Sequence, residues 1–273
     1  MVDTRMIQAG QVQLQCFEHG QGPETLVLVH GYQMSGRIWK LTQEALDPAR
    51  YRTIAISNRG AGDSDRGASE ADYTVESFAR DLFHAVNALG LEDATLVGHS
   101  MGGATVARFA LDHPELPKAV VLLNSTPLLG RPLADGWEGQ LRSQFAQGQA
   151  PRLSFDHLTS TLPEDFVAAL GADVARNPLE RMIAGRRSMS QLRLREQLHR
   201  LPMPVLVVGG DLDTTVGVDN ILADYLALPA QQRSLHIYHG VGHSPNVQLP
   251  ADLAALLAAF VGRVATATGQ ARR

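Results

Sequence analysis

Residues 96–103 read Leu96-Val97-Gly98-His99-Ser100-Met101-Gly102-Gly103, an apolar run that meets a serine set among glycines. The pattern indicates a buried strand that turns sharply into a helix, because glycine tolerates a strained turn and lets two backbones approach closely. Gly98, Ser100 and Gly102 match G-x-S-x-G, the nucleophile elbow. Such a short match also recurs by chance, and the alternative is a glycine-rich turn whose serine caps a helix. Support must come from an acid and a histidine further along the chain.

The composition is that of an ordinary globular chain. Its 273 residues are 44% apolar and 19% charged, which suits one large α/β core or two small domains. With a net charge of −4, the chain has no excess of positive charge to attract polyanions, so we expect neither nucleic acid nor a membrane surface as a partner. The single cysteine, Cys16, excludes an internal disulfide. Without an apolar signal region or membrane-spanning run, the chain is expected to be cytoplasmic.

Strand-like and helix-like patterns alternate over most of the chain. An alternating run at residues 11–18 predicts a peripheral antiparallel strand. Apolar runs typical of buried strands follow at residues 26–29, 52–56, 119–123, 205–208 and 235–238, and an Ala/Leu-rich helix is expected at 252–264. Helical spacing of three and four lies between them. The pattern predicts an α/β fold with a mostly parallel, doubly wound sheet and right-handed crossovers.

The alternation fails over one long stretch, where prolines separate helix-like segments that carry large apolar side chains. We interpret this stretch as a helical cap inserted into a single core. The predicted domains are residues 1–125 for the first part of the core, 126–202 for the cap and 203–273 for the second part.

Two late loops offer the acid and the histidine. Asp211 and Asp213 follow one strand-like run, and His243 follows the next. Such loops leave the carboxyl ends of parallel strands, where open α/β sheets build their sites. A serine hydroxyl becomes a useful nucleophile when a histidine, oriented by a carboxylate, accepts its proton. The order Ser100, acid, His243 is the one expected after an elbow serine.

Five motifs occur in order: H-G at residues 30–31, R-G-A-G-D-S at 59–64, G-H-S-M-G-G at 98–103, G-D-L-D at 210–213 and G-H at 242–243. With them the chain resembles α/β-hydrolase-fold enzymes of the small serine esterase and lactonase type over roughly residues 12 to 264. The family spacing from Gly210 makes Asp213 the acid, and the alternative for Asp211 is a loop residue that binds nearby backbone N–H groups. The resemblance also places the oxyanion hole at the backbone N–H groups of Tyr32 and Met101.

Other polar and apolar residues are weaker candidates. His30 is expected to hold the oxyanion loop, with substrate contact as the alternative. His236 and His239, with His243, suggest a metal site, but a three-residue separation in a strand sends side chains to opposite faces, so no metal is expected. The cap side chains that we expect in a substrate pocket, with packing onto the core as the alternative, are Trp137, Phe145 and Met182.

The resemblance implies a serine hydrolase without a cofactor. It would cleave an ester, thioester or lactone of a moderately hydrophobic small molecule through an acyl-enzyme on Ser100. Haloalkane dehalogenases and epoxide hydrolases of this fold carry aspartate at the elbow and are disfavoured. The alternatives are a carbon–carbon bond hydrolase, a cofactor-free perhydrolase or haloperoxidase-like enzyme, an acyltransferase, or a low-turnover ligand receptor. The sequence leaves a homo-oligomer open.

Overall fold

A single mixed sheet organises the described part of the computed structural model, which comprises residues 2–149, 153 and 160–271. The strand order is β1-β2-β4-β3-β5-β6-β7-β8. The strands are β1 (Asp3–Ala9), β2 (Val12–His19), β3 (Glu24–Val29), β4 (Tyr51–Ile56), β5 (Thr95–His99), β6 (Ala119–Leu123), β7 (Val205–Gly210) and β8 (Arg233–Tyr238). β1 and β2 pair antiparallel, and all pairs from β4 to β8 are parallel. The mostly parallel sheet predicted from the sequence is confirmed.

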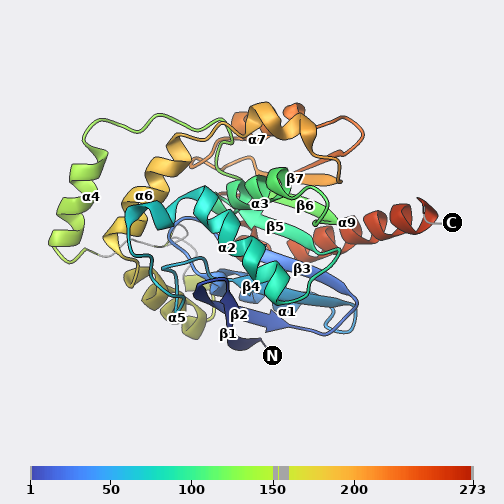
Figure 1. Ribbon diagram of the computed structural model, residues 1–273, viewed down its shortest axis with the longest axis horizontal. Coiled ribbons are helices and arrows are strands. Elements are labelled where there is room, and N and C mark those ends of the chain that lie inside the picture. Colours follow the sequence, from blue (N-terminus) through green and yellow to red (C-terminus); the bar gives the residue numbers. More distant parts are fainter. Residues whose placement is uncertain (1, 150–152, 154–159, 272–273) are drawn as a thin grey trace.

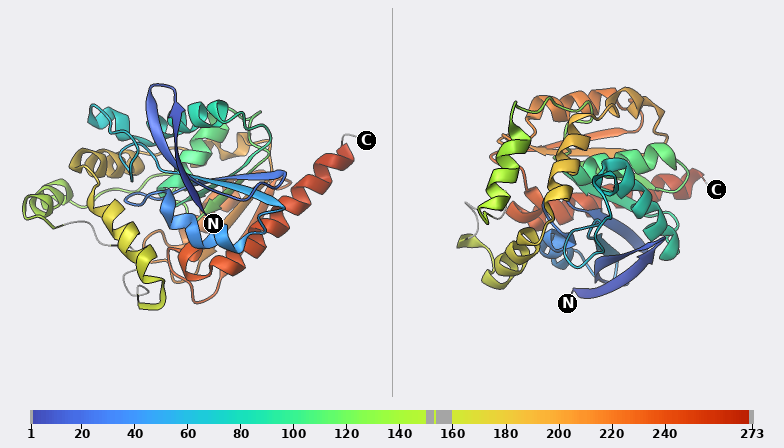
Figure 2. Two further views of the ribbon diagram at one scale, coloured as in Figure 1. Left: turned by 90° about the horizontal axis from the view of Figure 1, so that it is seen from below. Right: turned by 60° about the vertical axis from the view of Figure 1, so that its left-hand side comes forward.

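Helices cover both faces of the sheet (Figures 1 and 2). One face carries α2 (Val75–Ala88), α3 (Met101–Asp112) and α7 (Val218–Ala227). The opposite face carries α1 (Lys40–Ala45), α8 (Pro245–Gln248) and α9 (Pro250–Ala271), with the short 3₁₀ helix η1 (Gly36–Trp39) leading into α1. The arrangement is the doubly wound layer structure that the alternation of patterns predicts.

Alternate residues of the central strands enter two separate cores. In β3, Val27 and Val29 face the core under α2 and α3, whereas Leu26 and Leu28 face the core under α1 and α9. All four side chains are fully buried. Because both faces of a parallel sheet are covered, its strands appear in the sequence as continuous apolar runs.

Two elements differ from the sequence expectation. The edge strand β1 was not expected, because most of its side chains are exposed and it shows no clear alternation. It is recognisable only from its pairing with β2. The last helix extends past its expected end at residue 264 and projects from the body of the molecule (Figure 1). Its alanine-rich continuation favours helix over coil.

The chain leaves the sheet between β6 and β7 and forms helices at one end of the molecule (Figure 1). These are α4 (Trp137–Ala146), α5 (Glu164–Ala175) and α6 (Leu179–Ser190), after which the 3₁₀ helix η4 (Arg195–Arg200) returns to the core beside α3 and α7. Pro163 and Pro178 precede α5 and α6 directly, where a missing N–H costs no helical hydrogen bond. The division at residues 126 and 202 stays a prediction. In the described ranges, no helix is both long and apolar enough to cross a membrane.

Candidate active site

Ser100 lies in a strained turn between β5 and α3. Its φ of 54° and ψ of −119° belong to a region that residues with a side chain rarely adopt. A Cβ atom on Gly98 would lie 2.2 Å from the carbonyl oxygen of Gly102, and one on Gly102 would lie 2.3 Å from that of Val29. The two glycines therefore allow α3 to begin directly against the ends of β5 and β3, as the motif indicates.

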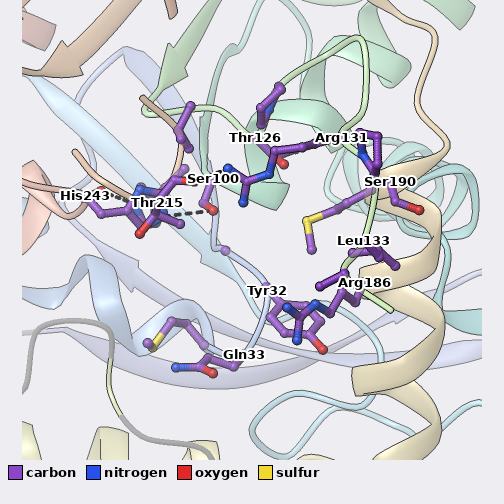
Figure 3. A pocket seen from close by; sticks show the side chains of 18 residues that line it. Tyr32, Gln33, Ser100, Thr126, Arg131, Leu133, Arg186, Ser190, Thr215 and His243 are labelled. Carbon is purple, nitrogen blue, oxygen red and sulfur yellow. Dashed lines mark hydrogen bonds between the residues drawn. The ribbon is translucent and has the colours of Figure 1, made fainter. Parts of the chain in front are cut away.

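Three side chains from three loops form a continuous hydrogen-bonded chain. His243 Nε2 lies 3.0 Å from Ser100 Oγ, and His243 Nδ1 lies 2.8 Å from Asp213 Oδ2. Figure 3 shows Ser100 and His243 facing one another beside the cavity. With Nδ1 donating to the carboxylate, Nε2 is the nitrogen available to accept the serine proton. The parallel sheet brings these loops together because β5, β7 and β8 end at the same edge.

Asp213 is held as a charged acceptor. Its Oδ1 accepts hydrogen bonds from the backbone N–H groups of Thr215 at 2.8 Å and Val216 at 3.0 Å, and its Oδ2 accepts one from Asn124 Nδ2 at 2.7 Å. Burial alone would raise the pKa of this carboxyl, but the bonds from His243, Asn124 and the backbone lower it to about 2. Asp213 is therefore ionised at neutral pH and fixes the orientation of the imidazole.

Asp211 occupies a different environment. Its Oδ1 accepts a hydrogen bond from the backbone N–H of Gly240 at 2.7 Å, and its Oδ2 lies 2.7 Å from Nδ1 of His239, whose side chain is 98% exposed. The structure thus brings Asp213, and not Asp211, to His243. Across the described residues, no cluster of His, Cys, Asp and Glu could hold a metal ion.

Two further histidines are buried beside Ser100. His99 Nε2 donates to the carbonyl oxygen of His243 at 2.8 Å. His30 Nε2 accepts from the backbone N–H of Asn58 at 2.9 Å, so its Nδ1 carries the proton that it donates to the carbonyl oxygen of Gly31 at 2.7 Å. Burial, the largest cause, lowers the pKa of each histidine to about 3. Both are neutral and hold the backbone around Ser100, which is the structural role expected for His30.

The loop after β3 approaches Ser100 closely. A Cβ atom on Gly31 would lie 3.0 Å from Ser100 Cβ, which places the next residue, Tyr32, over the elbow. Met101 begins α3, where backbone N–H groups have no helical acceptor. Within the described chain, the N–H groups of Tyr32 and Met101 donate no hydrogen bond. Both are thus available to an oxygen atom bound beside Ser100.

A cavity of about 480 Å³ opens at Ser100 (Figure 3). Its apolar wall comes largely from the loop after β6, α6 and the loop after β7. The side chains that form this wall include Met34, Pro127, Pro132, Leu133, Met189 and Val216. Its polar side chains include Gln33, Thr126, Ser190 and Thr215, and its cationic side chains are Arg131 and Arg186. No Asp or Glu occurs among the described residues that line it.

Comparison with known proteins identifies the fold family. The family model of the alpha/beta hydrolase fold matches residues 24–248. The chain belongs to the α/β hydrolase fold family. A pimeloyl-[acyl-carrier protein] methyl ester esterase of Aeromonas hydrophila subsp. hydrophila is 29% identical over 255 residues, which cover 89% of this chain and 97% of that protein. A non-heme chloroperoxidase of Burkholderia pyrrocinia is 27% identical over 258 residues, with 87% and 91% covered.

Solved structures show the same architecture. The bromoperoxidase from Bacillus anthracis superposes with a TM-score of 0.81 at 24% identity, and the match covers 95% of this chain and 100% of that one. At this identity the likeness concerns the fold alone. The family resemblance that the five motifs indicate is confirmed.

This α/β hydrolase fold protein packs its large cap side chains away from the cavity lining. Trp137, Phe145 and Met182 cluster with Leu141 and Ile183, and the backbone carbonyl of Met182 accepts a hydrogen bond from the hydroxyl of Tyr32. These three side chains were expected in the substrate pocket, and for His30 substrate contact was the alternative to its structural role; none of the four lines the cavity. The packing alternative describes them better, because Met182 is buried, and Trp137 and Phe145 are partly buried, where α4 and α6 pack together beside the Tyr32 ring.

Sequence reasoning missed several residues that the site contains. Asn124 directly follows β6, at the same sheet edge as the other loops, and this position is a signal that could have identified it. Arg131 and Arg186 carry no such signal, because only the folding of the excursion brings them to the cavity.

Proposed function

We propose that this chain is a serine hydrolase that cleaves carboxylic esters, thioesters or lactones. The observation that carries the proposal is the hydrogen-bonded chain from Ser100 through His243 to Asp213 at 3.0 and 2.8 Å, placed in a strained elbow beside a cavity. The relative from Aeromonas hydrophila, which is named as a methyl ester esterase, supports an ester substrate.

Acylation begins with the hydroxyl of Ser100. Its oxygen attacks the carbonyl carbon while His243 Nε2 accepts its proton, and Asp213 stabilises the imidazolium that forms. The negative oxygen of the tetrahedral intermediate receives hydrogen bonds from the N–H groups of Tyr32 and Met101. Collapse of the intermediate breaks the bond to the alcohol, and the alcohol oxygen leaves with the proton from His243. The acyl group is then bound to Ser100 Oγ.

Deacylation repeats these steps with water. His243 Nε2 accepts a proton from a water molecule, whose oxygen attacks the acyl carbon. The second tetrahedral intermediate is stabilised by the same N–H groups, and its collapse returns the proton to Ser100 Oγ. The products are a carboxylic acid and the free enzyme. A lactone follows the same path, and its alcohol remains attached to the acid product.

Substitution of the proposed nucleophile and base tests the function. Ser100→Ala and His243→Ala should each lower kcat for p-nitrophenyl esters by about 10⁴- to 10⁶-fold, and the double variant should lose little more, because the residues act as a unit. A fluorophosphonate should label the wild-type chain and not Ser100→Ala. Ser143→Ala, which changes an exposed serine of α4, serves as the matched control.

Two results would contradict the proposal. Losses that multiply in the double variant would show that Ser100 and His243 act independently. A folded chain that neither reacts with the fluorophosphonate nor turns over any ester or lactone would instead favour a ligand receptor built on the same fold.

A second candidate function is perhydrolysis, which the chloroperoxidase relative favours. Hydrogen peroxide would replace water in deacylation, with one peroxide oxygen attacking the acyl carbon and His243 accepting the proton, and the product would be a peroxy acid. Peroxy acid formed from an acetate ester and hydrogen peroxide, and absent with Ser100→Ala, would support it. If carboxylic acid is the sole product in the presence of peroxide, this candidate is wrong.

A further inference from the structure

Two arginines line the cavity beside Ser100, and no described carboxylate does. We infer that the substrate carries an anionic group, a carboxylate or a phosphate, that binds at the wall formed by Arg131 and Arg186. The inference rests on the proposed function, because it assigns a charge to the part of the substrate that Ser100 does not attack. Figure 3 shows Arg131 close to Ser100 in the view and Arg186 close to Tyr32.

Arg131 makes one hydrogen bond to the backbone beside the cavity. Its Nη1 donates to the carbonyl oxygen of Thr215 at 3.1 Å, and Thr215 in turn donates its N–H to Asp213. No carboxylate among the described residues pairs with Arg131, and a guanidinium has five N–H donors, so most of them stay available. The side chain is exposed, and its anchored end lies next to the loop that carries the acid.

Arg186 is also left without a carboxylate. Its guanidinium lies over the ring of Trp137, 5.4 Å from the centroid. The acidic side chains nearby are taken by its neighbour, because Arg187 binds Glu70 and Glu138, each at 2.7 Å. Of these two adjacent cations on α6, Arg187 is neutralised by ion pairs, whereas Arg186 faces the cavity with no ion pair in the described structure.

The backbone segments that carry the two arginines pack against each other. Gly130, with a φ of 74°, precedes Arg131, and a Cβ atom there would lie 2.4 Å from the carbonyl oxygen of Ser190 at the end of α6. The loop that carries Arg131 thus packs directly on the helix that carries Arg186. A Cβ atom on Gly185 would lie 3.3 Å from Cε2 of the Tyr32 ring, so α6 lies close to the residue that follows Gly31. Both arginines are exposed side chains carried by segments that pack together beside the cavity.

Charge and shape together define the class of substrate. The whole chain carries a net charge of −4, so the cationic wall is a local departure that concentrates anions at the site. Charge-assisted hydrogen bonds from guanidinium groups to a carboxylate or phosphate are strong and directional. The apolar part of the lining, which includes Leu133 and Met189, suits a hydrocarbon chain. The substrate is therefore an ester or thioester whose apolar chain bears an anion.

Three esters of similar length test the inference. Monomethyl adipate carries a carboxylate, dimethyl adipate has the same chain without a charge, and methyl 6-phosphonohexanoate carries a phosphonate. We expect kcat/KM for the better anionic ester to exceed that for dimethyl adipate by about tenfold, mainly through a lower KM. The preference should decrease in 0.5 M NaCl, because salt screens exposed charges. The preferred anion identifies the headgroup as a carboxylate or a phosphate.

Variants connect the preference to the two arginines. Arg131→Gln and Arg186→Gln should each raise KM for the anionic ester by about three- to tenfold more than KM for dimethyl adipate. Lysine at either position should restore part of the preference, since it keeps the charge and loses the guanidinium fork. Arg193→Gln is the matched control. Arg193 is an exposed arginine that also donates to a backbone carbonyl, that of Leu129 at 2.8 Å, but it does not line the cavity.

Binding separates this inference from the proposed function. Monomethyl adipate should bind Ser100→Ala in calorimetry, and the arginine substitutions should weaken that binding even though no turnover occurs. Equal or better hydrolysis of dimethyl adipate, unaffected by Arg131→Gln and Arg186→Gln, would overturn the inference and leave the serine hydrolase intact. If the wild type hydrolyses no ester but binds monomethyl adipate in a way that the arginine substitutions weaken, the anion site is supported and the proposed hydrolase function is wrong.

Discussion

Asp211 and Asp213 lie two residues apart in one loop, yet their surroundings differ completely. Asp213 accepts four hydrogen bonds in the interior, one of them from His243, whereas Asp211 pairs with the exposed His239. The four hydrogen bonds to Asp213 use both carboxylate oxygens. An asparagine at this position has one acceptor oxygen, and its amide nitrogen would lie against other hydrogen-bond donors. The carboxylate at position 213 therefore has a specific electrostatic role that an amide of the same shape cannot fill.

The first prediction at the residue scale compares these two acids. Asp213→Asn should lower kcat by about 10³- to 10⁴-fold with little change in KM, because the imidazole loses its orienting charge. Asp211→Asn should keep activity within a fewfold of the wild type and is the isosteric control. Steady-state kinetics on one p-nitrophenyl ester decides between them. If Asp211→Asn is the crippling change, the assignment of the acid is wrong.

Single residues were predictable from the sequence where local spacing determines their position. The glycines next to Ser100 allow the tight turn that places it at the end of the strand. Gly210 and Gly242 mark the loops of Asp213 and His243. Asn124 contacts Asp213 across 89 positions of sequence, so its partner depends on the order of strands in the sheet. The charges of Arg131 and Arg186 have no local signature at all.

At the scale of elements, the regular strands and helices were easier to predict than the helical excursion. Strands covered on both faces and amphipathic helices such as α2 have patterns that follow directly from their burial. The excursion between β6 and β7 is helical as expected, but the sequence does not tell which face of α4 or α6 meets the cavity. Weak amphipathicity leaves that choice to tertiary packing, and the large apolar residues turned out to pack between helices.

A prediction at this scale distinguishes residues of the excursion that line the cavity from residues that pack between its helices. Leu133→Ala and Met189→Ala remove apolar contacts from the cavity, so kcat/KM for long acyl esters should decrease about tenfold more than for short ones, at about 1 kcal/mol per lost methylene contact. Leu141→Ala is the matched control, because Leu141 is buried among Trp137, Phe145 and Met182 and does not line the cavity.

The control variant, Leu141→Ala, should differ from the lining variants in both stability and substrate preference. Leu141→Ala should lower the free energy of unfolding by about 2–5 kcal/mol without changing the preference for acyl length. Melting temperatures and a series of p-nitrophenyl esters measure the two effects separately. A uniform loss for all esters in Leu133→Ala, in proportion to its loss of stability, would show that Leu133 is structural.

For the whole molecule, the parallel sheet is what converts scattered motifs into one site. The loops that carry Tyr32, Ser100, Asp213 and His243 follow β3, β5, β7 and β8, and these strands are neighbours or near neighbours in the sheet order. Their carboxyl ends meet at one edge, which is the general location of sites in such folds. Buried polar groups support these loops from below, among them His30 and His99.

These two histidines make the stability of the whole fold dependent on pH. Burial holds their pKa at about 3 in the folded state, against an ordinary value of 6.5 in the unfolded chain. Between these values the unfolded state binds more protons, so the free energy of unfolding rises with pH through the window and falls on acidification. Each histidine contributes a slope of up to about 1.4 kcal/mol per pH unit. The pKa of Asp213 is 3.8 ordinarily and about 2 in the folded state, so its contribution to the free energy of unfolding is lost only at lower pH, between these two values.

Equilibrium unfolding in urea between pH 7.5 and 5 measures this slope, and a pH-stat measures the protons that the chain takes up when it unfolds. At pH 5 the uptake that His30 and His99 account for should be about two protons. His99→Asn should reduce it by about one. Because uptake is measured on the wild type as well, the prediction does not depend on the folding of a variant. A free energy of unfolding that stays constant from pH 7.5 to 5, with no proton uptake, would mean that the buried imidazoles are charged in the folded protein, and the neutral hydrogen-bonded support inferred for Ser100 would be wrong.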